Sequence, residues 1–195
     1  MSASKIRVEV LRAGNIVREG SMISDASSSV TLIRAESKNL LVDTGSPRVR
    51  EKLVAALKAE KLNPGDIDIV INTHLHLDHC GCNDMFVNAR FIAHVFESPP
   101  IHYNRISGDA TLFPGVAIHQ TPGHSPGSIS VFVTAERKYA VCGDALPTKG
   151  NFEQHVPPFI NTDSKLALKS MDFIVSWADV VIPGHDAQFD VIGKK

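Results

Sequence analysis

The sequence of 195 residues carries 20 Lys plus Arg and 21 Asp plus Glu, and its formal net charge of −1 gives no sign of the broad basic surface of a general nucleic-acid binder. Its composition, 43% hydrophobic and 21% charged, predicts a single globular domain over residues 1–195. No stretch reaches the ~18 apolar residues of a membrane span, the start lacks a cleavable signal pattern, and three cysteines do not suggest a disulfide framework. We therefore expect a cytoplasmic protein with no membrane partner.

The first half of the chain predicts several strands and one helix. Strands are expected at residues 7–12, 30–34, 40–43 and 67–71. Ser46 and Pro47 indicate the start of a helix, whose apolar residues recur at helical spacing until the Asn-Pro-Gly at 63–65. The run 67–71 is almost continuously apolar, as expected of a strand covered on both faces, and it leads directly into Thr73 and His74.

The second half predicts a second sheet and a further helix. Strands are expected at residues 91–93, 116–119, 129–133, 139–142 and 180–182. Asp163 should cap a helix on which one face is shared by Leu166, Ser170, Phe173, Ile174 and Trp177. The pattern indicates an α/β protein with two sheets that carry helices on their outer faces, and no linker or repeat divides it.

The residues that could carry chemistry begin where the buried strand at 67–71 ends. His74, His76, Asp78 and His79 place three imidazoles and a carboxylate within six residues. His74 and His76 project to the same side if the extended conformation continues, whereas Asp78 and His79 follow on the turn into a helix. Imidazole nitrogen and carboxylate oxygen suit zinc, and also iron or manganese.

Three further candidate ligands each follow a strand and a glycine. They are His124 in TPGHS, Asp144 in CGD and His185 in PGH. Glycine lets the backbone turn sharply and bring the next side chain over the end of a sheet. Because seven ligands exceed what one tetrahedral ion uses, we expect two divalent metal ions per chain, with Zn²⁺ as the expected ion and Fe or Mn as alternatives.

The motifs HxHxDH, TPGHS, GDA and PGHD, in this order, resemble those of the metallo-β-lactamase superfamily along nearly the whole chain. The resemblance implies the fold of that family, a four-layer αβ/βα sandwich. It also implies a first metal on His74, His76 and His124, a second metal on Asp78, His79 and His185, and Asp144 as the bridge between both. The early motif VDTG matches the family's acidic motif, which implies that the Asp43 carboxylate supports the metal ligands by partnering the other ring nitrogen of a ligating histidine. A plain turn aspartate is the alternative for Asp43.

Different parts of the chain are similar to different branches of that superfamily. Asp144 stands where the antibiotic-degrading branch has a cysteine, so β-lactam hydrolysis is not expected. The N-terminal half, with PGDIDIVINTHLHLDH, is similar to the metallo-β-lactamase domain-containing protein 1 family and its glyoxalase II-like relatives, for which a ribonuclease role has been proposed. The C-terminal half, with LFPGVAIHQTPGHSPG, resembles the acyl-homoserine lactonases, although their substrate-contacting tyrosine falls at Pro147, which cannot donate a hydrogen bond.

The chemistry implied by all these branches is hydrolysis. Two metals roughly 3.5–4 Å apart hold a bridging hydroxide and polarise the substrate oxygen, and Asp78 is expected to be the catalytic residue that orients this nucleophile. Since the same metal-bound nucleophile can attack a carbonyl carbon or a phosphorus atom, the metal site alone does not distinguish an ester from a phosphodiester substrate. A small-molecule ester, thioester or lactone is the expected substrate, an RNA phosphodiesterase is an alternative, and a non-catalytic metal sensor is another.

The walls of the pocket are expected from the stretch between Asp144 and the last helix. Candidate wall residues there are Lys149, Phe152, His155 and Phe159. His155 is the candidate general acid or substrate contact, with a surface histidine as the alternative. Cys80 and Cys82 are expected to be small packing residues. An apolar slot beside the metals would favour an acyl substrate, whereas a row of Lys and Arg would favour RNA. The oligomeric state stays open, with a homodimer as one option.

Overall fold

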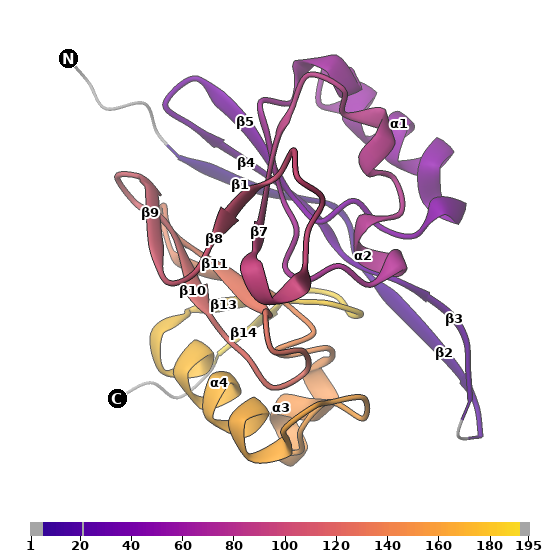
Figure 1. The fold of residues 1–195 in the computed structure, drawn as a ribbon, viewed down its shortest axis with the longest axis vertical. Coiled ribbons are helices and arrows are strands. Elements are labelled where there is room, and N and C mark those ends of the chain that lie inside the picture. Colours follow the sequence, from indigo (N-terminus) through magenta and orange to yellow (C-terminus); the bar gives the residue numbers. More distant parts are fainter. Residues whose placement is uncertain (1–5, 21, 192–195) are drawn as a thin grey trace.

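The computed structural model describes residues 6–20 and 22–191 and contains two six-stranded sheets and a separate two-stranded hairpin. Helix α1 (Arg50–Ala59) packs on the outer face of the first sheet, and helix α4 (Ser164–Trp177) packs on the outer face of the second. Figure 1 shows these two helices on opposite sides of the molecule, with the sheets between them. This is the predicted αβ/βα sandwich, so the prediction of the fold class is confirmed.

The first sheet combines an antiparallel part with a parallel part. Its strands lie in the order β1 (Arg7–Arg12), β4 (Val30–Ala35), β5 (Lys38–Val42), β6 (Ile69–Ile71), β7 (Arg90–His94) and β8 (Asn104–Ile106). The pairs from β1 to β5 are antiparallel, and those from β5 to β8 are parallel. The carboxyl ends of β5, β6 and β7 therefore meet at one edge of the sheet.

The second sheet brings three further strand ends to a common edge. Its strands lie in the order β14 (Phe189–Asp190), β13 (Val180–Pro183), β12 (Lys138–Gly143), β11 (Ile129–Thr134), β10 (Val116–Gln120) and β9 (Ala110–Phe113). Strands β12 and β13 are parallel, and β10 and β12 are both antiparallel to β11. Hence β10, β12 and β13 all run in one direction and end at the same edge.

The side chains alternate between two hydrophobic layers, as the period of a strand requires. In the first sheet, Val42 and Ile71 point to the core between the sheets, whereas Leu41 and Val70 pack beneath α1. Each such side chain is almost fully buried, which stabilises the fold by about 1.5–3 kcal/mol per residue. The sandwich therefore has a core of its own that does not depend on the strand ends.

Helix α4 confirms one prediction and corrects another. The carboxylate of Asp163 accepts a hydrogen bond from the Leu166 amide at 2.9 Å, so the predicted cap is present. The predicted buried face is partly wrong, because Leu166 and Phe173 are 38% and 42% exposed, and the buried residues are Ala167, Ser170, Met171 and Ile174. The small Ala167 is fully buried, and Gly123 approaches it so closely that a Cβ on Gly123 would lie 2.3 Å from the Ala167 nitrogen.

The remaining elements are short, and all except the one that precedes β6 lie around the edge where the strands end. They are η1 (Pro47–Val49), η2 (Pro64–Asp66), α2 (Leu77–Cys80), η3 (Asn83–Met85), η4 (Val95–Glu97) and α3 (Lys149–Gln154). A hairpin of β2 (Asn15–Glu19) and β3 (Met22–Ser27), which the sequence did not predict, projects from the body of the molecule (Figure 1). Within the described part of the chain, no helix has the length and apolar character needed to cross a membrane.

Candidate metal centre

The predicted metal ligands follow the strand ends of both sheets. After β6 the chain stays extended, with φ −66° and ψ 146° at His76, and α2 begins at the next residue. The rings of His74 and His76 therefore lie side by side, with centroids 4.5 Å apart, and Asp78 and His79 occupy the single turn of α2. The other ligands come from the second sheet, where they follow β10, β12 and β13.

Three histidines form the first group of donors. His124 Nε2 lies 3.2 Å from His74 Nε2 and 3.1 Å from His76 Nδ1. His74 and His124 are buried, and His76 is exposed at the rim. The three donor atoms lie within 4.8 Å of one another, a spacing that one metal ion could bridge.

A second group consists of Asp78, His79 and His185. His185 Nε2 lies 3.4 Å from His79 Nε2 and 3.4 Å from Asp78 Oδ2. Its donor atoms also lie within 4.8 Å of one another. The two groups thus offer a second position for a cation beside the first.

Asp144 lies between the two groups. Its Oδ1 is 3.3 Å from His79 Nε2 and 3.2 Å from His185 Nε2, and its Oδ2 is 3.6 Å from His124 Nε2. Oδ1 is buried and accepts no hydrogen bond of regular geometry from the described residues. An unpaired buried carboxylate oxygen is costly unless a cation neutralises it, so this position fits a bridge between two metal ions.

Hydrogen bonds at the outer nitrogens fix the orientation of three rings. Nδ1 of His79 donates to Asp43 Oδ2 at 2.7 Å, and Nδ1 of His124 donates to the Ile160 carbonyl at 2.7 Å. Nδ1 of His185 faces the carbonyls of Asn15 and Ser27 at 3.1 and 3.2 Å. A neutral imidazole that donates through Nδ1 presents a lone pair at Nε2. The Nε2 atoms of His79 and His185 therefore face each other at 3.4 Å without a donor between them, whereas Nε2 of His124 faces His74 and His76. A cation at each group would satisfy these lone pairs.

Asp43 contacts the cluster from outside the seven candidate ligands. It is 2% exposed, and besides His79 it accepts hydrogen bonds from the amide and the hydroxyl of Thr73 at 2.8 and 2.7 Å. The residue has a left-handed backbone with φ 57°, an uncommon conformation outside glycine. These contacts connect the end of β5 to the chain that leaves β6, which a plain turn aspartate would not do.

Replacing Asp43 with asparagine should weaken metal binding at the second group by about 10- to 100-fold, the usual effect of losing an outer partner of a ligating histidine. The amide keeps the size of the side chain but removes the charge opposite His79 Nδ1. Competition with a metal chelator measures this affinity. An unchanged affinity would show that Asp43 only shapes the turn.

Two glycines allow the strands to approach the centre closely. Gly143 has φ 48°, and a Cβ there would lie 2.2 Å from Thr73 Oγ1. A Cβ on Gly184 would lie 2.2 Å from Asp144 Oδ1. Glycine is therefore required before Asp144 and His185 because a side chain there would collide with a neighbouring atom, and also because the backbone turns sharply at these positions.

The electrostatics of the cluster indicate a need for positive charge. Burial lowers the pKa of His74 well below its usual range, and the neighbouring His79 lowers it further. Burial also lowers the pKa of His79, but Asp43 and Asp144 outweigh it and raise this pKa well above its usual range. Burial would raise the pKa of Asp144, yet His79 and His185 hold it well below the usual range. The carboxylates thus stabilise a cationic site, and a metal ion supplies that charge in place of a proton.

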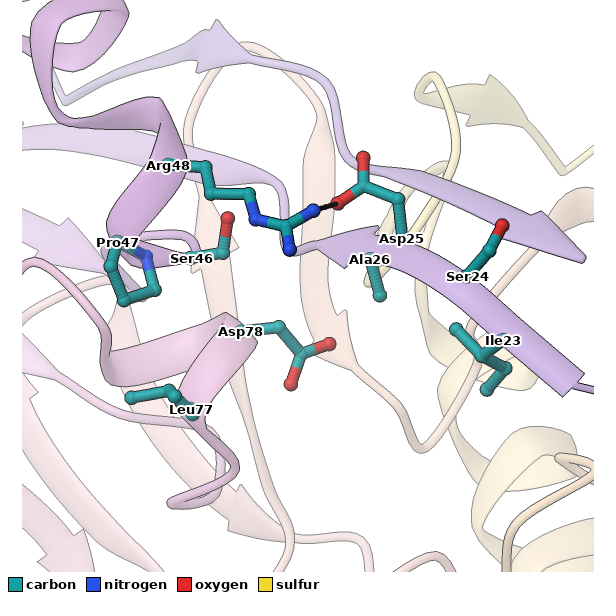
Figure 2. Close-up of a pocket in the computed structure, with 9 residues that line it drawn as sticks. All are labelled: Ile23, Ser24, Asp25, Ala26, Ser46, Pro47, Arg48, Leu77 and Asp78. Atoms are coloured by element: carbon teal, nitrogen blue, oxygen red, sulfur yellow. Dashed lines mark hydrogen bonds and ion pairs between the residues drawn. The ribbon is translucent and has the colours of Figure 1, made fainter.

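A slot of about 380 Å³ opens beside Asp78 (Figure 2). Its apolar walls are Ile23 and Ala26 from β3, Pro47 from η1, and Leu77 from α2. Arg48 and Asp25 form an ion pair of 3.2 Å across it, which Figure 2 draws as a dashed line. The sequence did not predict these walls, because one side of the slot, from Ile23 to Ala26, belongs to the hairpin that it missed.

A second cavity of about 410 Å³ lies between the hairpin and α3. It is lined by Ile16, Arg18, Thr148, Gly150, Asn151, Gln154, Val156, Pro157 and Phe159. The guanidinium of Arg18 lies 4.9 Å from the centre of the Phe159 ring. Phe159 lines this cavity, whereas Phe152 stacks on Phe189 and lines another cavity together with Lys149. None of the proposed metal ligands lines either cavity, so the role of these residues as walls of the metal site stays a prediction.

His155 is not among the residues that the fold brings to the metal cluster. It follows α3 with φ 50°, and its Nε2 pairs with Asp172 Oδ1 on α4 at 2.9 Å. Its side chain is 61% exposed. A catalytic role for His155 stays a prediction, and this exposed ion pair favours the alternative of a surface histidine.

The two cysteines beside His79 make contacts of their own. Cys82 is buried and donates to the Ser46 carbonyl, and Cys80 is half-buried and donates to the Leu75 carbonyl. Burial raises the pKa of Cys80 to about 11, so this thiol carries little thiolate character near neutral pH. Both side chains are engaged in packing and backbone contacts, in keeping with their expected role.

An αβ/βα sandwich with a His and Asp cluster at its strand ends belongs to the class of metal-dependent hydrolases. The sequence profile of the metallo-beta-lactamase superfamily matches residues 24–185, and the chain belongs to this superfamily.

Relatives of known name support this assignment. The chain is 40% identical to a probable metallo-hydrolase from Methanocaldococcus jannaschii in an alignment of 184 residues that covers 93% of this chain and 88% of that protein. It is 32% identical to metallo-beta-lactamase domain-containing protein 1 from Xenopus laevis, over 95% of this chain and 82% of that protein. It is 31% identical to an N-acyl homoserine lactonase from Bacillus thuringiensis, over 80% of each. Both predicted resemblances are thereby confirmed.

A crystal structure of a variant of the Bacillus thuringiensis lactonase, with N-decanoyl-L-homoserine bound at its active site, is also similar. The TM-score is 0.71 at 28% identity, and the similarity covers 89% of this chain and 88% of that one. The chain is thus a metal-dependent hydrolase that is related to lactonases.

Proposed function

We propose that the chain is a dinuclear hydrolase that cleaves a small ester, thioester or lactone. The observation that supports this most directly is the convergence of seven His and Asp side chains in two groups joined by Asp144. Their nitrogen and oxygen donors suit zinc, with iron and manganese as alternatives. The relation to lactonases supports an acyl substrate.

Bound metal ions supply the Lewis acidity that activates a water molecule and polarises the substrate oxygen. The chain's own residues position the reactants. Of the seven proposed ligands, Asp78 is the one that lines the slot, so its carboxylate can accept a hydrogen bond from the attacking water while it faces the substrate. The buried rings of His74 and His79 exclude bulk water from the other side of the cluster.

The walls of the slot favour an acyl group over RNA. They are mainly apolar, and the one cation among them, Arg48, is neutralised by Asp25. A phosphate backbone would require several unpaired Lys or Arg along its path. The slot volume also lies within the range of small-ligand sites.

The position of the lactonase tyrosine offers no comparable contact. Pro147 is buried here, and its carbonyl accepts the His185 amide at 2.7 Å. The residue therefore helps to hold a proposed ligand. We infer that substrate contacts come from the hairpin and α2 side of the slot instead.

The proposal is tested by a panel of lactones, thioesters, bis-p-nitrophenyl phosphate and RNA, with each of several metals supplied. We expect turnover on the acyl substrates, and a rate that rises with acyl chain length until the slot is filled. Cleavage of RNA with no acyl turnover would instead establish the phosphodiesterase. Metal binding with no turnover on any member would favour a sensor.

Removal of the metal should abolish activity while leaving most secondary structure intact. The hydrophobic layers lie between and outside the sheets, so they can be buried without the metal, unlike the core of a small zinc-dependent module. Metal analysis of the reconstituted protein should give two ions per chain, and circular dichroism after chelation should change little. A single ion after full reconstitution, or a collapse of the spectrum on chelation, would contradict this expectation.

A further inference from the structure

The first group of donors comes from two segments that are far apart in sequence. His74 and His76 follow β6 in the first sheet, whereas His124 follows β10 in the second sheet. Nε2 of His124 lies 3.1 to 3.2 Å from ring nitrogens of His74 and His76, so a further contact must fix the spacing of the two segments. Asp43 and the carbonyl of Ile160 orient single rings, and neither connects these two segments.

Glu97 makes that connection from η4, the short helix that follows β7. Its Oε2 accepts a hydrogen bond from the Leu75 amide, between the two histidines, at 3.1 Å. Its Oε1 accepts from the Ser125 hydroxyl, next to His124, at 2.6 Å and from the Gly127 amide at 3.0 Å. One carboxylate thus links both ligand segments, each at a residue adjacent to a proposed ligand.

The loop after His124 is built closely around this carboxylate. A Cβ on Gly127 would lie 2.7 Å from Oε1 and 2.8 Å from Cγ of Glu97, so only glycine allows the approach. The Ser125 hydroxyl also meets the Ser128 hydroxyl at 2.7 Å, and Ser128 in turn accepts from the Ser125 amide at 3.1 Å. Each oxygen of Glu97 is therefore held by donors in a fixed geometry.

We propose that Glu97 is a positioning residue of the three-histidine group, and that it sets the distance between His124 and the pair His74 and His76. This inference rests on the proposed function, because it assumes that the group holds a metal ion. The contacts of Glu97 go to the two segments of the first group, whereas the second group is oriented by Asp43 and by carbonyls near the hairpin. Loss of Glu97 should therefore affect one of the two ions selectively.

The variant Glu97→Gln keeps the size of the side chain but removes its charge, and its amide group must face at least one N–H or O–H donor. We expect the affinity for the ion of the first group to fall by about 10- to 100-fold, as for other outer contacts of metal sites, and the affinity for the second ion to stay unchanged. Stepwise zinc titration against a competing chelator gives the two affinities. Long-range ¹H–¹⁵N spectra of the imidazoles assign each affinity to its group, because the signals of His124 report on the first group and those of His185 on the second.

Asp68→Asn is the matched control. Asp68 is also a carboxylate that accepts a backbone amide, that of Asn39 at 2.9 Å, but it lies before β6, at the opposite end of that strand from His74. This variant should leave both metal affinities unchanged. A general loss of stability would lower both affinities, whereas a positioning role lowers one.

The inference is overturned if Glu97→Gln binds both ions as the wild type does, or if it weakens both equally. A wild-type protein that binds a single ion or none would refute the proposed function instead, and the assumption about the first group with it. Amide hydrogen exchange at Leu75 and Gly127 adds a readout that needs no metal, since both amides should exchange faster in Glu97→Gln than in Asp68→Asn. Unchanged exchange would show that Glu97 does not hold these segments.

Discussion

Replacing Asp144 with alanine is expected to lower turnover by at least ~10³-fold and to abolish tight binding of both metal ions. Its two oxygens face different groups, with Oδ1 near His79 and His185 and Oδ2 near His124, so the change removes a donor from each position. Metal ions contribute several kcal/mol of charge stabilisation in the transition state, and each 1.36 kcal/mol corresponds to tenfold in rate. Turnover on the best substrate of the panel and metal content after dialysis measure the two effects.

The matched control is Asp172→Ala, which removes an exposed carboxylate from α4 that pairs with His155. It should retain both ions and wild-type turnover, because exposed ion pairs contribute little. Normal turnover would also favour the surface role of His155, whose ring loses its partner in this variant. If Asp144→Ala kept two ions and its activity, Asp144 would not be the bridge between the groups.

The convergence of the seven candidate ligands could be predicted because its signals are local. HxHxDH follows an apolar run that is fully buried as β6, and each of the later candidates follows a strand and a glycine. Strands that run in the same direction end at the same edge of a sheet, and the order of strands and helices in the sequence already indicates that direction. The position of Asp43 followed from the family resemblance, since a single Asp after a strand is not distinctive by itself.

The walls of the slot and the outer contacts could not be predicted in this way. Strands β2 and β3 contain few apolar residues and no clear alternation, and they pair with each other outside the two sheets. His124 and His185 contact the backbone carbonyls of Ile160 and Ser27. Because every residue has a backbone carbonyl, the sequence carries no signal for these contacts. Glu97 has no motif either, because its three partners come together only in the folded chain.

The buried face of α4 shows a different limit. The helical period correctly placed Ser170 and Ile174 on the buried face of the helix. The prediction named large apolar residues for the rest of that face and left out the small Ala167, which is fully buried. The close approach of Gly123 selects the small residue there, and Phe173 instead stacks at the edge on Phe132, with ring centroids 5.3 Å apart. The hydrophobic period of a helix predicts which side is buried, whereas packing against a neighbouring loop decides which residues lie at the middle of that side.

Asp78 differs from the other proposed ligands because it contacts both the cluster and the slot. Its Oδ2 lies 3.4 Å from His185 Nε2, and its side chain is 26% exposed toward the slot. Figure 2 shows the carboxylate in the space between β3 and α2. A group in this position can bind the second ion and orient the attacking water at the same time, so its removal should reduce the rate more than the binding of substrate.

Asp78→Asn should therefore lower turnover by at least ~10²-fold with metal held saturating, the usual loss when a group that positions the nucleophile and its proton is removed. The amide keeps one oxygen for the metal but loses the negative charge that aims the water. Asp84→Asn is the control, because Asp84 is an exposed residue of η3 whose partner is Arg50, at 2.6 Å. Turnover, KM and metal content are measured for both variants on the same substrate. The role of Asp78 requires a fall in kcat with KM little changed in Asp78→Asn alone, since a variant that only lost metal would recover as zinc is raised. Equal turnover in the two variants would remove Asp78 from the mechanism and leave the orientation of the water to the remaining ligands.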